Sequence, residues 1–175
     1  MIPIEIEFEP RWFQSGFYVY VITVQHKNKG RYFYIGQTGD RSHIAARSPF
    51  YRLMGHFNTY GVNQKGTDAQ LIKYLKEKDL IETHHKSLRV NVETSIANGT
   101  VGITAKYFKI NDISLNKDEH TFRRKNIEDI ETCLIQKFRQ TYPDKIFNNP
   151  HKIGNNRTIN NEDAESCAET IFKQF

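Results

Sequence analysis

The sequence predicts a small α/β (α+β) domain, because stretches typical of strands and stretches typical of helices share one short chain. Residues 17–24 (FYVYVITV) and 31–37 (RYFYIGQ) are rich in β-branched and aromatic residues, the composition of strands that bury at least one face. Residues 126–140 and 162–173 repeat apolar residues at helical spacing. A chain of 175 residues is long enough to form one such domain around a core.

The first two strands are expected to form a hairpin. The polar segment between them (QHKNKG) ends in Gly30 and is typical of a hairpin loop. Both alternate sets of residues in the first strand are apolar, so this strand is expected to be central and covered on both faces. Tyr18, Tyr20 and Ile22 share one side of it. Gly36 ends the second strand, where a side chain would obstruct a close approach.

Two helices are expected next. Ser48 is a good N-cap and a proline follows it. Arg52 and His56 lie one turn apart on one face of this first helix, so they can act on one object. The alternative is a solvated basic edge. Thr67 opens the second helix, with Gln70 three residues on in a capping-box pattern. This helix is expected to run to about residue 79.

Residues 87–96 (SLRVNVETSI) and 103–110 (ITAKYFKI) are two strand-like runs. Asn98-Gly99 lies between them, and Asn-Gly between alternating runs predicts a hairpin. Which of the two runs is the third strand of the core sheet is left open.

The helix over residues 126–140 carries Glu131 within its apolar stripe. A carboxylate on the core-facing side of a helix is costly unless it is paired, hydrogen-bonded or bound to a metal. A bond to a core tyrosine or arginine and a role as a metal ligand therefore stay open alternatives. The last helix, over residues 162–173, has one apolar face that is expected to pack on the domain or on a second subunit.

The composition indicates a cytoplasmic protein without a membrane span. No apolar run approaches the ~20 residues that a span needs, and the N-terminus lacks the basic region of a signal peptide. Cys133 and Cys167 are far apart and without metal-ligand spacing, so we expect them to be small packing residues. The net charge is +5, and residues 1–156 alone carry +7, which is compatible with nucleic acid as a partner.

Five short motifs together resemble the GIY-YIG nuclease family. Gly16-Phe17-Tyr18 and Tyr34-Ile35-Gly36 resemble the two tripeptides that give the family its name. Arg52-Leu-Met-Gly-His56 resembles its R-x-x-x-H arrangement, Glu131-Thr-Cys-Leu-Ile its E-x-x-L-I segment, and Phe147-Asn148 its aromatic-Asn step. The resemblance covers residues 16–148, with all five motifs in the family's order.

The resemblance implies a central antiparallel three-stranded sheet flanked by helices. The nuclease-like domain would span residues 16–150, with residues 1–15 as an N-terminal arm and 151–175 as a linker and C-terminal helix. Residues 61–115 are longer than a minimal family domain needs, so part of this stretch is expected to be an inserted β-hairpin and helix. Arg52 lies further from Tyr34 than in compact members, so Arg47 or Arg41 could hold its role.

The implied activity is metal-dependent hydrolysis of DNA phosphodiester bonds, with one Mg²⁺ (or Mn²⁺) ion per active site. A neighbouring arginine, histidine or metal-bound water is expected to make a phenolate more accessible. The expected roles are Tyr18 as general base, Tyr34 on the water or phosphate, Arg52 on the transition-state charge, His56 accepting a proton or holding Tyr18, Glu131 as metal ligand, and Asn148 as a brace.

The implied partner is double-stranded DNA, with a homodimer as one option. The sequence contains no obvious separate DNA-binding domain, as in the small type II restriction endonucleases of the family. A repair or mobile-element nuclease is the alternative within the family, and a non-cleaving nucleic-acid-binding module on the same fold is the alternative outside it. The residues expected to contact DNA are Arg41, Arg47, Arg123, Arg124 and Lys125.

Overall fold

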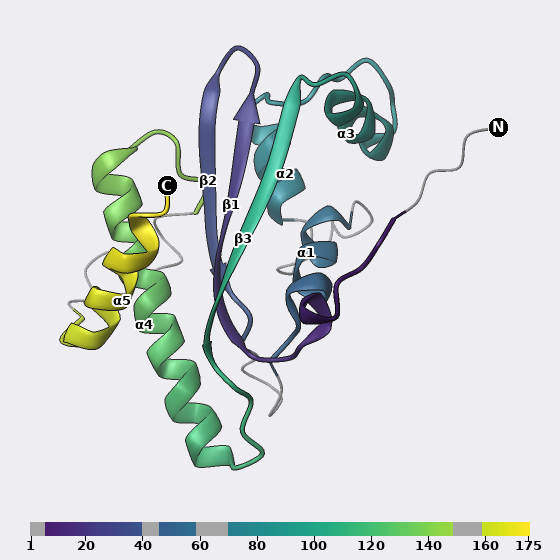
Figure 1. Ribbon diagram of the computed structural model, residues 1–175. Helices are drawn as coiled ribbons and strands as arrows, with labels where there is room; N and C mark the ends of the chain where they lie inside the picture. The colour runs from purple at the N-terminus through teal and green to yellow at the C-terminus, as the bar shows by residue number, and fades with distance from the viewer. Residues whose placement is uncertain (1–5, 40–45, 59–69, 149–158) are drawn as a thin grey trace.

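The computed structural model describes residues 6–39, 46–58, 70–148 and 159–175. Its centre is an antiparallel sheet of three strands in the order β2-β1-β3, which confirms the predicted sheet. Helices α4 and α5 lie on one side of the sheet, and α1, α2 and α3 lie on the other (Figure 1). The strands are β1 (Phe17–His26), β2 (Gly30–Gln37) and β3 (Val101–Asn111), and the α-helices are α1 (Pro49–Phe57), α2 (Gln70–Glu77), α3 (Leu88–Ala97), α4 (Lys117–Thr141) and α5 (Glu162–Phe172).

Strand β1 is the central strand and is buried on both faces, as predicted. Phe17, Val19 and Val21 pack in the core beneath α4 and α5, whereas Tyr20 and Ile22 pack in the core beneath α2 and α3. The two sides of the sheet therefore have separate cores, and the tyrosine-bearing side is the one that α1 and α2 approach.

The β1–β2 turn is stabilised by a histidine. The Nδ1 atom of His26 accepts hydrogen bonds from the backbone N–H groups of Asn28 (3.1 Å) and Lys29 (3.0 Å). Gly30 has φ +80, a conformation that side chains disfavour. These contacts fix the register of the hairpin.

Helix α1 begins where the sequence predicts. The Ser48 hydroxyl accepts a hydrogen bond from the Tyr51 N–H at 3.5 Å, and Pro49 is the first helical residue. The N-terminal arm packs against this helix through a short 3-10 helix, η1 (Pro10–Phe13). Phe8 and Phe13 contact the Phe50 ring, with centroid distances of 5.5 and 4.7 Å.

The predicted hairpin at Asn98-Gly99 is wrong, because the first strand-like run forms helix α3. Gly99 has φ +74 and its N–H bonds the Ile96 carbonyl, so Asn-Gly ends a helix here rather than turning a hairpin. Buried polar contacts hold the helix. Asn91 exchanges two hydrogen bonds with the His85 backbone, and Ser95 accepts one from the Glu82 N–H. The third strand is thus β3, which pairs with the whole of β1.

Helix α4 starts nine residues earlier than predicted. Asn116 caps it by accepting hydrogen bonds from the N–H groups of Asp118 and Glu119, and these two acids suit the positive end of the helix dipole. Arg123-Arg124-Lys125 consequently lies inside the helix rather than at its N-terminus.

Helix α5 packs along α4 through apolar residues, so its predicted apolar face is used within the chain. None of the helices in the described residues is both long and apolar enough to cross a bilayer.

Candidate active site

The hydroxyl of Tyr20 is the meeting point of the candidate site. It accepts a hydrogen bond from Arg52 Nε at 2.9 Å and lies 2.8 Å from His56 Nε2. Arg52 and His56 are one turn apart on α1, so one short helix delivers both groups to the phenol. The Tyr20 and His56 side chains are almost completely buried, and such polar groups are stable there only when hydrogen-bonded.

Tyr34 lies beside this group on the neighbouring strand. Its ring centroid is 4.9 Å from that of His56 and 6.3 Å from that of Tyr20. The Tyr34 hydroxyl donates a hydrogen bond to Gln70 Oε1 at the start of α2. Gln70 is therefore a site residue that the sequence indicated only as part of a helix cap.

Gly36 makes room for the Tyr20 phenol. The two residues lie directly opposite one another in the β1–β2 register, and a Cβ atom on Gly36 would overlap the Tyr20 hydroxyl and ring. The glycine of the Tyr-Ile-Gly motif therefore has a steric role: it lets a phenol from the central strand lie across the edge strand.

Glu131 joins the group from the other side of the sheet. Its side chain is partly buried on α4, a helix that packs against β1 and β2. Its negative charge contributes to raising the pKa values of Tyr20 and Tyr34, and also that of Arg52. The carboxylate, the two phenols and the guanidinium therefore share one electrostatic environment.

The pKa values of the Tyr20 and Tyr34 phenols are raised, despite the positive charge of Arg52 nearby. Burial raises the pKa of Tyr20 to about 12, although the charge and hydrogen bond of Arg52 lower it. Burial also raises the pKa of Tyr34 well above its ordinary value. Desolvation therefore outweighs the effect of Arg52 on Tyr20, although Arg52 itself lowers the pKa of that phenol as expected.

His56 is neutral over the physiological range. Burial, and then the positive charge of Arg52, lower its pKa to about 3. A neutral imidazole has one nitrogen that accepts a proton, and His56 Nε2 faces the Tyr20 hydroxyl. Within the described residues, the Nδ1 atom of His56 has no hydrogen-bond partner.

Tyr18, the residue expected to act as general base, lies two residues before Tyr20 on β1, and it is Tyr20 that Arg52 and His56 contact. The Tyr18 backbone N–H donates to the Thr38 hydroxyl at 2.9 Å, and its carbonyl accepts from the Thr38 N–H. The same hydroxyl donates to the Gly16 carbonyl. The Tyr18 ring packs edge-on against Tyr107, with a centroid distance of 6.5 Å. The Gly-Phe-Tyr motif thus fastens the start of β1 to the end of β2, and the phenol at Arg52 is that of Tyr20.

Tyr107 on β3 is a further site residue that the sequence did not single out. Tyr107 is paired with Tyr20 in the β1–β3 register, and the two ring centroids are 4.9 Å apart. The Tyr107 hydroxyl is buried and has no hydrogen-bond partner within the described residues. Burial raises the pKa of Tyr107, with a smaller contribution from Tyr20.

Asn148 braces the strand that carries Tyr34. Its Oδ1 accepts from the Ile35 N–H at 2.9 Å and its Nδ2 donates to the Ile35 carbonyl at 2.7 Å. Arg139 Nη2 donates to the Asn148 carbonyl. The side chain therefore replaces a neighbouring strand at the edge of β2, one residue from Tyr34.

The structure separates the residues expected to contact DNA. Arg47 is exposed at the start of α1, and Arg41 lies outside the described residues. Arg123 pairs with Glu119 and Arg124 with Glu128, each one turn away on α4.

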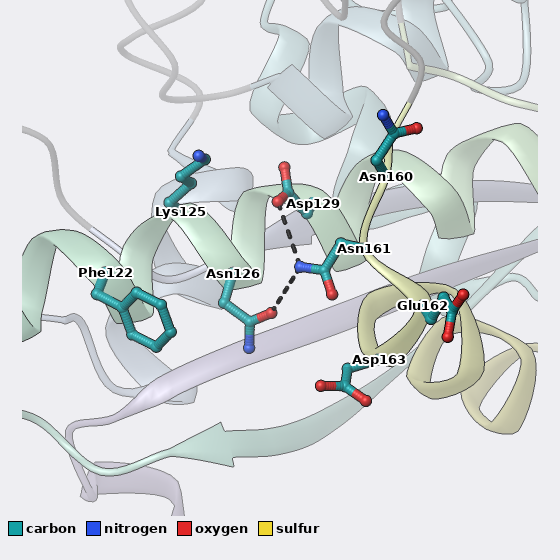
Figure 2. A pocket seen from close by; sticks show the side chains of 8 residues that line it. All are labelled: Phe122, Lys125, Asn126, Asp129, Asn160, Asn161, Glu162 and Asp163. Carbon is teal, nitrogen blue, oxygen red and sulfur yellow. Dashed lines mark hydrogen bonds between the residues drawn. The ribbon is translucent and has the colours of Figure 1, made fainter.

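Lys125 lies in an acidic environment. It borders a hollow of about 490 Å³ between α4 and the start of α5, which Asp129, Glu162 and Asp163 also line (Figure 2). Asn161 reaches across this hollow to Asp129 and Asn126. Three carboxylates around one lysine make this surface unfavourable for a phosphate.

The site offers oxygen donors for a divalent ion. Glu131 supplies a partly buried carboxylate that acts electrostatically on the phenols of Tyr20 and Tyr34, and Mg²⁺ prefers oxygen ligands with few carboxylates. No group of three or more His, Cys, Asp and Glu side chains that could hold a metal occurs in the part of the chain that the structure describes. The donor set therefore fits an ion with one protein carboxylate and with water or phosphate as its other ligands.

Comparisons of the chain with models of known protein families, with curated proteins and with solved structures found no match.

Proposed function

We propose that this protein is a metal-dependent DNA endonuclease that hydrolyses phosphodiester bonds at the Tyr20–Arg52–His56 group. The observation that carries the proposal is the buried Tyr20 hydroxyl, with Arg52 Nε at 2.9 Å and His56 Nε2 at 2.8 Å. Sheet cores are ordinarily filled by apolar side chains, and burying phenols, an imidazole and a guanidinium together is costly. Such a concentration of polar groups with shifted pKa values is typical of a functional site.

Arg52 is suited to hold the scissile phosphate. Only its Nε donates a hydrogen bond within the described residues, which leaves the Nη1 and Nη2 fork for two phosphate oxygens. A guanidinium held in this way stabilises the charge that develops on phosphorus in the transition state.

Tyr20 and His56 are suited to orient the attacking water. At neutral pH the phenol is protonated and His56 is neutral, so the Tyr20 hydroxyl can donate toward Nε2. In the proposed reaction the Tyr20 oxygen, held in place by Arg52 and His56, positions the attacking water for its approach to phosphorus. Tyr34 orients the water or a phosphate oxygen beside it.

Glu131 would hold one Mg²⁺ or Mn²⁺ ion. Such an ion supplies Lewis-acid neutralisation of the phosphate and a more acidic bound water. The charge of Glu131 is one of the causes that raise the pKa of Tyr20, after burial, so binding a cation at Glu131 would favour ionisation of the phenol. Asn148 keeps Tyr34 in place by bracing Ile35.

The finer assignment within this activity is a sequence-specific type II restriction endonuclease. It is supported by the resemblance of five motifs over residues 16–148 and by the three-stranded antiparallel sheet flanked by helices, which agrees with the fold that this resemblance implies. The test is to digest DNA of mixed sequence with the purified protein, with and without Mg²⁺, and to sequence the ends. Ends that share one short sequence support restriction, and ends without a shared sequence support a repair or mobile-element role. Bound but uncut DNA in both Mg²⁺ and Mn²⁺ contradicts the nuclease proposal.

A further inference from the structure

Helix α1 has a second face, turned away from the candidate active site, that borders a groove. This groove lies between α1 and α3, has a volume of about 620 Å³, and includes Tyr51, Met54 and Ile96 in its lining. These three side chains are 66%, 52% and 39% exposed. Exposed apolar side chains gathered in one hollow mark an interaction site more often than ordinary surface.

The side chains that line the groove carry more positive than negative charge. Arg47 and Arg89 line it, and Glu93 is the one acidic residue among the lining residues in the described chain. Glu93 already pairs with Arg89, at 2.9 Å from its Nη1. The Arg89 side chain remains 58% exposed, so its other donors face solvent.

The groove and the candidate site share one helix. Tyr51 precedes Arg52, and Gly55, which lines the groove, precedes His56. An α-helix with its side chains is roughly 10–12 Å across. A DNA strand whose phosphate contacts Arg52 therefore reaches the groove within a few nucleotides.

We propose that the α1–α3 groove binds an unstacked nucleotide of the substrate DNA strand, with its base against Tyr51 and its phosphates against Arg47 and Arg89. This proposal rests on the proposed function, because the strand in the groove is the one that Arg52 holds. A nucleotide offers both a π-face for the exposed phenol and anionic oxygens for the guanidiniums. A purely apolar partner would instead have to remove these guanidiniums from water without offering them an anion.

The experiment measures DNA binding without cleavage. Full-length Glu131→Gln protein is titrated, in the absence of metal, into a fluorescein-labelled DNA strand and into the matching duplex, and anisotropy is recorded at several salt concentrations. In this background Tyr51→Ala is expected to weaken strand binding about tenfold or more without changing the salt slope. Tyr51→Phe is expected to retain the affinity, because the ring still stacks.

Arg89→Ala is expected to weaken binding and to lower the slope of log affinity against log salt by about 0.7. The matched control is Lys173→Ala, which removes one positive charge from another exposed i,i+4 pair, on α5, and is expected to leave both quantities unchanged. Unchanged strand affinity in both Tyr51→Ala and Arg89→Ala overturns the proposal.

Sedimentation velocity on the same proteins tests the rival occupant, a second copy of the chain. A dimer that Tyr51→Ala dissociates, with DNA affinity unchanged, also overturns the proposal. Cleavage by the wild-type protein is scored separately. If wild type cleaves DNA but Tyr51→Ala binds DNA as tightly as the Tyr51 protein, the groove proposal alone is overturned. If binding depends on Tyr51 but no metal supports cleavage, the nuclease proposal is overturned and the groove proposal stands. A protein that binds no DNA overturns both.

Discussion

Tyr20 and Gly36 are opposite one another on β1 and β2, and the phenol of Tyr20 fills the space that a side chain at residue 36 would need. The tyrosine thereby crosses the edge strand and reaches Arg52 and His56. The site can therefore assemble only because residue 36 of β2 has no side chain.

Gly36→Ala is expected to displace the Tyr20 ring, because the new methyl group would overlap it. The expected cost is about 1–3 kcal/mol of the free energy of unfolding, with loss of DNA cleavage. Gly102→Ala is the control, since its Cβ would meet only ordinary contacts at 3.9 Å on Gln25. Urea unfolding of both variants checks the prediction, and equal stabilities would show that Tyr20 does not need the space.

Tyr20→Phe removes the oxygen that Arg52 and His56 both contact, and it is expected to slow cleavage by about 100-fold or more. Tyr18→Phe removes a phenol whose ring packs on Tyr107 and is expected to stay within a few-fold of wild type. Single-turnover cleavage rates compare the two. The reverse order would assign the chemistry to Tyr18.

The stability of the protein is expected to fall with acid because of His56. Its pKa is about 3 in the folded protein against 6.5 in the unfolded chain, so between these values the unfolded chain binds a proton that the folded chain does not. Stability from this group is complete above pH 6.5 and declines by about 1.4 kcal/mol per pH unit below it.

His56→Gln cannot titrate in this range, so acidification from pH 6.5 to 4.5 should destabilise it less than wild type. Chemical unfolding at several pH values gives the difference directly. A difference between the two proteins that is independent of pH would mean that His56 is not buried in its neutral form.

Tyr107→Phe is expected to leave stability unchanged or to raise it. The buried hydroxyl of Tyr107 has no partner within the described residues, and removing such a group relieves a desolvation cost of about 1–3 kcal/mol. Thermal unfolding checks this against Tyr32→Phe, whose hydroxyl accepts a hydrogen bond from Lys145 Nζ. A clear fall in melting temperature for Tyr107→Phe would show that its hydroxyl is engaged.

The sequence predicts β1, β2 and α1 closely, because their signals are local. Runs of β-branched and aromatic residues define the two strands, and Ser48-Pro49 defines the start of α1. The spacing of Arg52 and His56 then places both on one helix face. The tripeptide motif favours Tyr18 over Tyr20 as the reactive phenol. Counting the register back from the turn at Gly30 would have placed Tyr20 opposite Gly36.

The remaining differences come from tertiary contacts that a local pattern does not contain. Helix α3 is held by Asn91 and Ser95, whose partners lie in the preceding loop, so its alternating sequence was misleading. The raised pKa of Tyr20 depends on how completely the folded chain removes the phenol from water. The nearby arginine is visible in the sequence, but the extent of burial is not.

Plasmid cleavage in Mg²⁺ and in EDTA measures whether Glu131 supports phosphodiester cleavage at the Tyr20 site. Glu128→Gln is the matched control, since Glu128 lies on the same helix and pairs with Arg124. We expect wild type and Glu128→Gln to cut only with metal, and Glu131→Gln to bind DNA but to cut at least about 100-fold more slowly. Cleavage by Glu131→Gln at the wild-type rate, or intact plasmid with wild type in both Mg²⁺ and Mn²⁺, would contradict this expectation.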